Sequence, residues 1–193
     1  MYKFFLFFYF IKSKVINYLK FRIFDIKFGK NCKVNGSLFL KGKGSTEIGN
    51  NVIINSSYIK NPIGGQTFTS IVVADKGKLK IGNNVGMSNC AIFCSQQIVI
   101  KDFVLIGGNC KIYDTDFHSI YLDDRIQVPE IGVKNAKVLI KEGAFIGASS
   151  IILKGVEIGK KAVVAAGSVV SKNIPDNEVW GGNPAKFIKK IEN

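Results

Sequence analysis

The sequence is poor in histidine and in paired cysteines, and both shortages argue against metal sites. Histidine occurs once, at His118, so a histidine-rich metal site is excluded. The four cysteines, Cys32, Cys90, Cys94 and Cys110, lack zinc-site spacing. We interpret them as reduced thiols of a cytosolic protein, with Cys90 and Cys94 in the interior. A covalent acyl route through Cys94 or Cys110 is an alternative, although neither cysteine has a visible base partner.

Nucleotide-binding loops and long apolar runs are also missing. No GxGxxG or Walker motif follows a strand and opens a helix, so mononucleotide-binding folds are not supported. The apolar run from Phe4 to Ile11 is far shorter than the roughly 20 residues needed to cross a bilayer. No small-residue cleavage site follows it, so we expect no signal peptide.

Acidic residues are scarce relative to basic ones. The chain has 14 Asp and Glu against 27 Lys and Arg, a formal net charge of +13. This charge favours anionic partners such as phosphate-bearing ligands or an anionic membrane. We expect no nucleic-acid partner, because the lysines are spread along the chain and no nucleic-acid-binding motif occurs. Solvated surface lysine is the alternative explanation for much of the charge.

One six-residue phrase repeats through residues 140–175. An aliphatic residue recurs every six positions, at Ile140, Ile146, Ile152, Ile158, Val164 and Val170. A small residue or Val follows four positions later, at Ala144, Ser150, Val156, Ala162 and Ser168. Neither a helix nor a strand period gives this pattern, whereas hexapeptide repeats form β-helices. We therefore predict an all-β triangular prism with three repeats per coil and the aliphatic residues inside.

The same phase occurs earlier in the chain and is interrupted twice. Units begin at Ile48, Ile81, Met87, Phe93, Ile100, Ile106 and Ile112, with one extra residue after Phe93. The interruptions span about 55–69 and about 114–137, and long insertions in a solenoid indicate functional surface. Gly147, Gly159 and Gly167 lie near expected corners, where they suit tight turns.

The repeat and the ending GSVVSKNIPDNEVWGGNPAKFIKKI resemble the left-handed β-helix acyltransferases, the hexapeptide-repeat superfamily, including its sugar and polysaccharide O-acetyltransferases. The resemblance covers about Asn31 to Ile191. It implies a left-handed parallel β-helix over 29–176 and, over 177–193, a loop and a short basic C-terminal helix. It also implies acetyl-CoA as co-substrate, no required metal, and a homotrimer with sites between subunits.

Residues 1–28 differ from the repeats, and we expect a short amphipathic N-terminal helix there. Ile11, Val15, Leu19 and Ile23 share one helical face at i, i+4 spacing, with basic residues among them. A basic, aromatic-rich helix favours peripheral membrane contact through residues 1–24, on the inner face of the cytoplasmic membrane. Packing on the prism or between subunits is the alternative, with a purely cytoplasmic location.

The second interruption contains the motif DTDFH, which matches the Asp-x-Asp-x-His motif of the family. By resemblance, His118 is the general base that removes a proton from an acceptor hydroxyl. Asp116, Asp114 or a backbone carbonyl would orient the ring, although both aspartates are equally suited to capping turns. Arg125 would bind an acceptor phosphate or carboxylate, or pair with a neighbouring aspartate. Asn89 would face the acceptor sugar, or form a corner turn.

The donor site is inferred from the last coils by the same resemblance. Backbone groups at Ala148 and Ala166, 18 residues and one full coil apart, would bind the pantetheine arm. Packing of small residues is the alternative explanation for these alanines. The remaining coenzyme A contacts are expected at Phe145, Ser171, Lys172, Lys186 and Lys189.

These features predict a homotrimeric, acetyl-CoA-dependent O-acetyltransferase that acts on a saccharide hydroxyl in surface-polysaccharide biosynthesis. The acceptor could be free, nucleotide-linked or lipid-linked. An N-acetyltransferase of a nucleotide-linked amino sugar is the nearest alternative, and a non-catalytic β-helix scaffold is an alternative of a different class. A carbonic anhydrase on these coils would need three histidine ligands per zinc, and this chain has one histidine.

Overall fold

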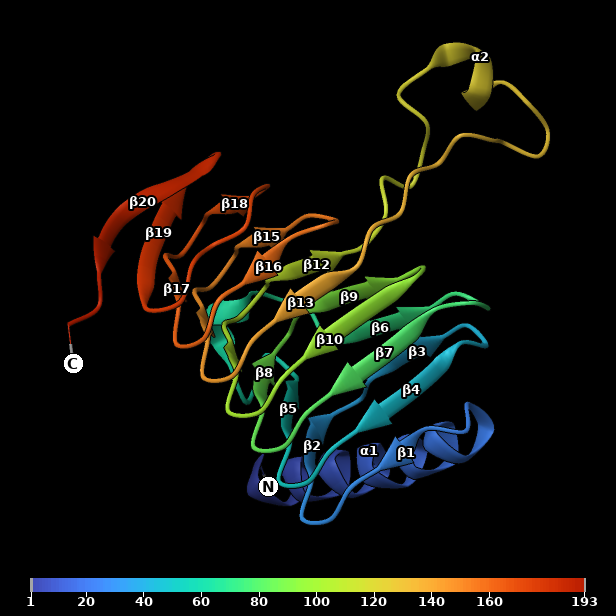
Figure 1. The fold of residues 1–193 in the computed structure, drawn as a ribbon. Coiled ribbons are helices and arrows are strands. Elements are labelled where there is room, and N and C mark those ends of the chain that lie inside the picture. The colour runs from blue at the N-terminus through green and yellow to red at the C-terminus, as the bar shows by residue number, and fades with distance from the viewer. Residues whose placement is uncertain (1, 193) are drawn as a thin grey trace.

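The chain folds into a three-sided prism of stacked coils (Figure 1). A computed structural model describes residues 2–192, with side chains from Phe8 onward, so the side chains of the run Phe4–Phe7 lie outside the described part. Each face of the prism is a sheet whose strands pair in parallel with those one coil away, except for the last strand of the chain, which pairs antiparallel. The predicted all-β, left-handed parallel β-helix is confirmed.

Three sheets form the faces. Sheet A contains β1 (Lys27–Phe28), β4 (Ser45–Ile48), β7 (Lys78–Ile81), β10 (Gln97–Ile100), β13 (Val138–Ile140) and β16 (Glu157–Ile158). Sheet B contains β2 (Lys33–Gly36), β5 (Ile53–Ser56), β8 (Gly86–Ser88), β11 (Leu105–Ile106), β14 (Phe145–Ile146), β17 (Val163–Val164), β19 (Glu178–Gly182) and β20 (Ala185–Lys190). Sheet C contains β3 (Phe39–Lys41), β6 (Ser70–Val73), β9 (Ala91–Cys94), β12 (Lys111–Tyr113), β15 (Ile151–Ile152) and β18 (Val169–Val170).

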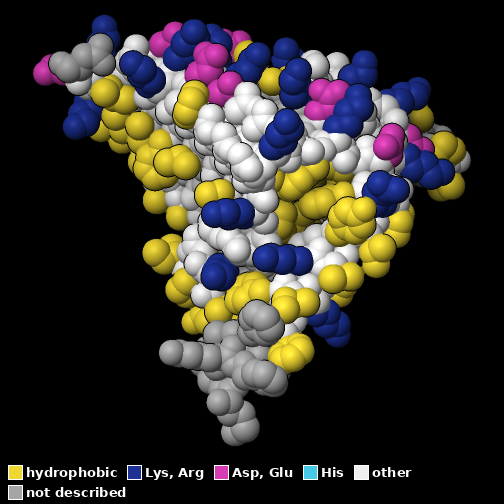
Figure 2. All heavy atoms as spheres, turned by 90° about the horizontal axis from the view of Figure 1, so that it is seen from below, with side chains coloured by type: hydrophobic (Ala, Val, Ile, Leu, Met, Phe, Trp, Pro, Cys, Tyr) yellow, Lys and Arg dark blue, Asp and Glu magenta, His cyan; other side chains and the backbone are white. Residues whose placement is uncertain are grey.

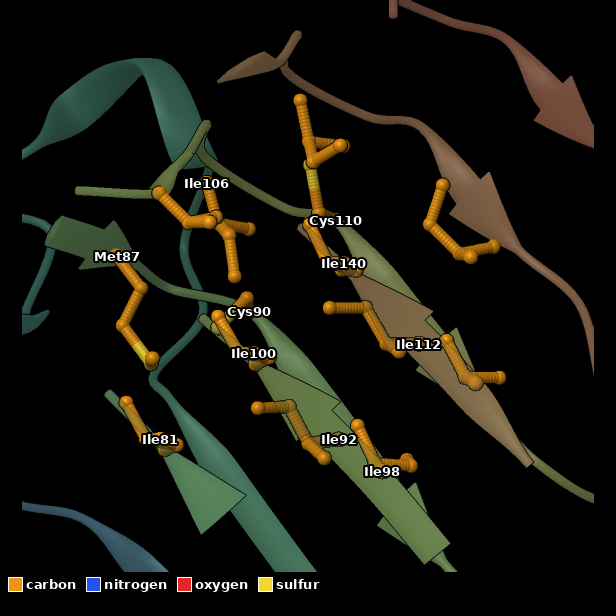
Figure 3. Close-up of a cluster of buried hydrophobic side chains, with 14 of the residues drawn as sticks. Ile81, Met87, Cys90, Ile92, Ile98, Ile100, Ile106, Cys110, Ile112 and Ile140 are labelled. Atoms are coloured by element: carbon orange, nitrogen blue, oxygen red, sulfur yellow. The ribbon is translucent and has the colours of Figure 1, made fainter. Parts of the chain in front are cut away.

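The six-residue period places the core as predicted. The aliphatic residues that open the units from Ile140 to Val170 are all buried, and so are the small residues four positions later. Figure 3 shows such side chains, among them Ile106, Ile112 and Ile140, gathered inside the prism. Full burial of one aliphatic side chain contributes roughly 1.5–3 kcal/mol, so the stacked interior accounts for much of the stability.

One predicted unit is out of phase. Ile92 and Cys94 are buried, whereas Phe93 is half-buried on the outside of sheet C. Ile92 pairs in register with Ile112, so the corner between Met87 and Ile92 is one residue shorter than the six-residue unit. The prediction that Phe93 points inward is therefore wrong.

The corner glycines are needed for two different reasons. Gly167 has a φ of +73°, the left-handed conformation that glycine adopts without steric cost. Gly147 lacks positive φ, but a Cβ there would lie 2.5 Å from the backbone nitrogen of Ala166. Gly159 is equally crowded, with an added Cβ 2.4 Å from the nitrogen of Asp176. Close stacking of neighbouring coils thus requires Gly147 and Gly159, whereas the turn conformation requires Gly167.

The predicted N-terminal helix is present with a shifted boundary, whereas the C-terminal end differs from the prediction. Helix α1 (Tyr2–Ile23) lies across the base of the prism, but the β-helix already begins with β1, inside the predicted N-terminal segment 1–28. The predicted C-terminal helix is wrong, because β19 and β20 form an antiparallel hairpin instead. β19 pairs in parallel with β17, so this hairpin covers the sheet edge that the last coil would otherwise leave open.

Both interruptions of the repeat are loops at corners of the prism. The first lies between β5 and β6 and contains the short 3-10 helix η1 (Pro62–Gly64). The second lies between β12 and β13 and contains α2 (Leu122–Arg125). Figure 1 shows the second loop projecting well away from the coils.

Candidate functional site

The second loop leaves the prism at the corner between sheets C and A, and its root is fixed. The backbone nitrogen of Asp116 donates to the carbonyl of Lys134 at 3.0 Å, and that of Ala136 donates to Asp114 at 2.9 Å. Phe117 sits on the outer face of sheet C, with ring centroids 4.8 Å from Phe93 and 5.1 Å from Tyr113. These contacts place the next residue, His118, at a defined position beside sheet C.

The two aspartates of the motif have other partners than His118. Asp114 is fully buried, and its carboxylate accepts hydrogen bonds from the backbone nitrogens of Ser95, Gln96 and Gln97 at 2.6–2.8 Å. Asp116 forms an ion pair with Lys154 at 2.9 Å. Turn capping, the alternative weighed for these residues, therefore describes Asp114, and neither carboxylate orients the histidine.

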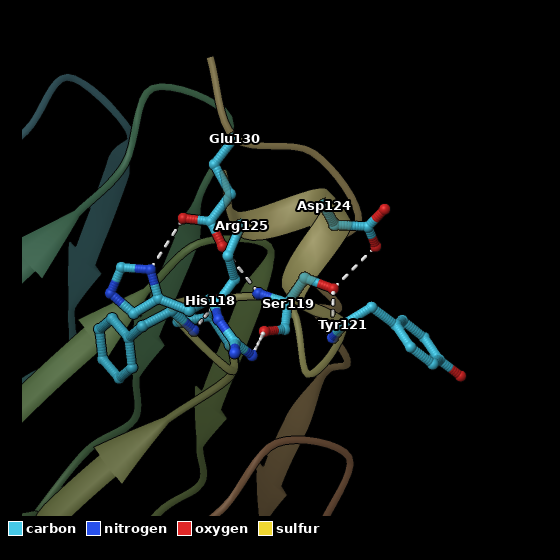
Figure 4. A network of polar contacts seen from close by, with 8 residues as sticks. His118, Ser119, Tyr121, Asp124, Arg125 and Glu130 are labelled. Carbon is cyan, nitrogen blue, oxygen red and sulfur yellow. Dashed lines mark hydrogen bonds and ion pairs between the residues drawn. The ribbon is translucent and has the colours of Figure 1, made fainter. Parts of the chain in front are cut away.

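Glu130 holds the imidazole instead (Figure 4). One carboxylate oxygen lies 2.8 Å from Nδ1 of His118, and the other accepts the backbone N–H of Ser119 at 2.8 Å. These hydrogen bonds, first the one with His118, hold the pKa of Glu130 below its usual value, so the carboxylate is charged at neutral pH. Among residues 2–192, Nε2 of His118 has no hydrogen-bond partner, and the side chain is 72% exposed.

This geometry suits proton acceptance. A carboxylate accepts a hydrogen bond from Nδ1–H, which leaves the lone pair of a neutral imidazole on Nε2. The accessible nitrogen is thus the basic one. Sequence reasoning missed Glu130, because it lies 12 positions from His118 and no motif connects the two.

The rest of the loop supports the same pair. Ser119 donates its hydroxyl to Asp124 at 2.8 Å, and Arg125 donates from Nη1 to the carbonyl of Ser119 at 2.8 Å (Figure 4). The suggested ion pair of Arg125 with Asp123 or Asp124 is not found within the described residues. Arg125 instead stabilises the loop through its bond to Ser119, and its other guanidinium N–H groups remain available.

Asn89 lies at a different corner, between sheets B and C. It has a φ of +44°, is buried, and donates its amide to the carbonyl of Asn61 in the first loop at 2.9 Å. This is the corner-turn alternative, with an added role in docking the loop. Its Oδ1 has no partner among the described residues, and a hollow of about 340 Å³ beside it is lined by Phe68, Asn89 and Lys111 among others.

The cysteines do not form a nucleophilic site. Burial raises the pKa of Cys90 and of Cys94 to about 12, and it also raises the pKa of Cys110. These thiols are protonated at neutral pH, and the thiolate is the nucleophilic form. The structure therefore does not support the acyl route through Cys94 or Cys110.

Ala148 and Ala166 occupy consecutive rungs of the corner between sheets B and C. The carbonyl of Ala148 accepts the N–H of Gly167 at 2.8 Å, so the two coils are directly stacked there. The backbone N–H groups of Ala148 and Ala166 have no acceptor among residues 2–192, although the neighbouring N–H groups of Gly147 and Gly167 do. We call these two backbone N–H groups without acceptors, one coil apart, the alanine ladder.

The other predicted donor-site residues lie in the last coils, toward the C-terminal end of the prism. Phe145 is 44% exposed on the outer face of sheet B. Ser171 and Lys172 directly follow β18, at the far end of sheet C from Ala166. Lys186 and Lys189 are exposed on β20. One chain thus holds the alanine ladder and the His118 loop at two different corners of the prism.

Among the described residues, no group of three or more His, Cys, Asp or Glu side chains is placed to hold a metal ion. No helix in that part of the chain is long and apolar enough to cross a membrane.

Comparison with known proteins agrees with this fold. The family model described as the hexapeptide repeat of succinyl-transferase matches residues 137–172. The chain is 39% identical over 103 residues to the galactoside O-acetyltransferase of Lactococcus lactis, covering 53% of this chain and 48% of that protein. It spans about half the length of the first curated relatives that it matches.

Solved structures match over most of both chains. The N-acyltransferase AntD of Bacillus cereus, in complex with dTDP and 3-hydroxybutyryl-CoA, has a TM-score of 0.70 and 26% identity, covering 91% of this chain and 88% of AntD. The hexapeptide-repeat acetyltransferase VCA0836 of Vibrio cholerae with acetyl coenzyme A has a TM-score of 0.54 and 25% identity, covering 92% and 76%. These findings confirm that the chain resembles the hexapeptide-repeat acyltransferases, sugar O-acetyltransferases among them.

Proposed function

We propose that the protein transfers an acetyl group from acetyl-CoA to a saccharide hydroxyl, with His118 as general base, in the biosynthesis of surface polysaccharide. The observation that carries the proposal is the pairing of His118 Nδ1 with Glu130, which leaves Nε2 basic and accessible on a loop of a hexapeptide-repeat prism. The galactoside O-acetyltransferase relative supports a sugar hydroxyl as the acceptor.

The proposed reaction needs no covalent enzyme intermediate. Nε2 of His118 takes the proton from the acceptor hydroxyl as its oxygen attacks the thioester carbonyl. The C–S bond then breaks, and the coenzyme A thiolate leaves with the proton that His118 returns. Glu130 stabilises the imidazolium between these two transfers, since the charged carboxylate faces Nδ1.

The alanine ladder suits the donor. The unused N–H groups of Ala148 and Ala166 are one coil apart and could bind successive amide carbonyls of the pantetheine arm, beside the exposed ring of Phe145. The hydroxyl of Ser171 and the lysines near the top of the prism would bind the nucleotide phosphates. These lysines are Lys172, Lys186 and Lys189.

A complete site then requires more than one copy of the chain. His118 and the alanine ladder lie at different corners, and a homotrimer would bring the His118 loop of one subunit to the ladder of its neighbour. Asn89, one of the residues that line the hollow at the corner between sheets B and C, and Arg125, with its remaining donors, are the proposed acceptor contacts.

N-acylation of a nucleotide-linked amino sugar is the second candidate. It is favoured by the similarity to AntD, an N-acyltransferase whose structure holds dTDP and an acyl-CoA. The same base and donor ladder would serve an amine, so the acceptor decides between the two. A scaffold without activity remains the alternative in which His118 is dispensable.

The test offers radiolabelled acetyl-CoA together with lipid extract, polysaccharide or nucleotide sugars. We expect label in a saccharide, and His118→Ala should lower turnover by at least about 10²-fold with the assembly unchanged. Val128→Ala, a fully exposed site in the same loop, is the matched control and should retain activity. Label in an amino-sugar amide would favour the second candidate, and normal turnover of His118→Ala would remove it as base.

A further inference from the structure

Helix α1 is held on the base of the prism by its polar side. Asn17 is buried, donates its amide to the carbonyl of Gly36 at 2.8 Å, and accepts the N–H of Leu38 at 3.0 Å. Lys20 donates to the carbonyl of Leu38, and the ring of Phe21 stacks on Phe28 at 4.6 Å. These contacts fix which side of the helix faces the protein.

The opposite side of α1 is mostly apolar and faces away from the prism. Residues three or four positions apart form this outer face, which lies across the helix from Asn17. It consists of Phe8, Ile11, Val15, Tyr18, Leu19 and Ile23, with exposed fractions of 43–75%. Figure 2 shows hydrophobic side chains gathered on this underside of the molecule, beside lysine and arginine side chains. These outer-face residues therefore do not pack the helix against its own chain.

Positive charge lies within the outer face and at its edge. Lys12 and Arg22 are three or four positions from members of the face and so fall among them, whereas Lys14 lies toward Asn17. Lys12, Lys14 and Arg22 are exposed, and α1 contains no Asp or Glu over Tyr2–Ile23. No carboxylate among the described residues lies within 4.0 Å of these three side chains. A second copy of the helix on this face would bring like charges together, which disfavours self-association.

A hollow of about 360 Å³ lies between α1 and β2 at the margin of this face. Lys14, Tyr18, Phe21 and Lys33 are among the residues that line it. Two ammonium groups beside aromatic rings suit a phosphate headgroup with the first carbons of its chain.

We infer that the outer face of α1 docks the protein on the surface of an anionic membrane. The helix lies in the interface with its apolar residues among the acyl chains, while Lys12, Lys14 and Arg22 neutralise lipid phosphates. The prism projects from the membrane on the other side of the helix. This docking is independent of acetyl transfer.

The test is co-sedimentation of the full chain with vesicles of phosphatidylcholine and phosphatidylglycerol, or of phosphatidylcholine alone, without acetyl-CoA or acceptor. We expect binding to the anionic vesicles that falls with added salt. The double variant Val15→Ser/Leu19→Ser should lower the partition coefficient at least about tenfold. Lys12→Glu/Arg22→Glu should lower it by a similar factor.

The charge control is Lys101→Glu/Lys161→Glu, which alters two exposed lysines on upper coils and changes the net charge equally. Retained binding of this control, with an unchanged melting curve for every variant, supports docking through α1. An equal loss in the control would overturn the inference in favour of diffuse attraction. No vesicle binding by the parent chain would overturn it too, as would a smaller soluble assembly of the serine variant, which would assign the face to self-association.

Discussion

At the scale of single residues, the ring of His118 is oriented by a contact that also determines which nitrogen remains available as a base. The carboxylate of Glu130 bridges Nδ1 of His118 and the backbone N–H of Ser119, both at 2.8 Å. The lowered pKa of Glu130 keeps this acceptor charged, and the charge is lost only as pH falls below the ordinary carboxyl range. Glu130 touches no reacting atom in the proposed reaction and is thus a positioning residue.

Glu130→Gln tests this role, because an amide can donate its N–H to Nδ1 and so favour the other tautomer. We expect a decrease in kcat of about 10–10²-fold with an unchanged KM for acetyl-CoA. His118 is the sole histidine, so nitrogen NMR of a chain without added histidines reports one imidazole. The proton should move from Nδ1 toward Nε2 in the variant. An unchanged tautomer with unchanged kcat would show that Glu130 only holds the loop together.

The sequence points to the proposed base but not to its surroundings. His118 is assigned from a motif of five consecutive residues, and such a motif can be recognised directly in the sequence. The partner of the imidazole depends on how a 12-residue stretch closes on itself, and nothing in the spacing of Glu130 reports that closure. Asp114 and Asp116 were assigned by proximity in sequence, whereas their carboxylates are engaged by a neighbouring corner and by Lys154.

At the scale of elements, the repeat predicts most of the prism because one residue in six decides each strand. The prediction fails where a corner changes length, as between Met87 and Ile92, since a shift of one residue turns the next side chain outward. It also fails at the C-terminus. The C-terminal segment forms strand β19 because the edge of β17 would otherwise be unpaired. This is a tertiary contact, which the local sequence pattern does not report.

Neighbouring residues of β15 test the phase directly. Ile152 is fully buried and Ile151 lies on the outer face. Ile152→Asp places an unpaired carboxylate in the core and should cost several kcal/mol, about 3–5, enough to unfold a marginal coil stack. Ile151→Asp makes the same chemical change and should cost less than about 1.5 kcal/mol. Thermal and denaturant unfolding compare the two, and a stable Ile152→Asp protein would contradict the buried assignment.

At the scale of the whole molecule, the main feature is that one chain separates the two halves of the proposed site. The His118 loop leaves the corner between sheets C and A, whereas the N–H ladder of Ala148 and Ala166 lies at the corner between sheets B and C. A prism of parallel sheets is too rigid to bring these corners together, since its core is continuous. We therefore expect catalysis at the proposed site to depend on association between copies.

Mixed assemblies test this dependence. His118→Ala removes the base, and Ala166→Trp fills the space before the N–H ladder, so each variant alone should be inactive. In trimers co-expressed from both genes in equal amounts, about a quarter of the sites combine an intact loop with an intact ladder from a neighbour. We therefore expect co-expression to restore activity, to about a quarter of that of the unaltered protein. Separately purified variants mixed without subunit exchange are the control and should stay inactive. If co-expressed chains show no more activity than the sum of the two variants, both halves of the site belong to one subunit, and the proposed site between subunits is wrong.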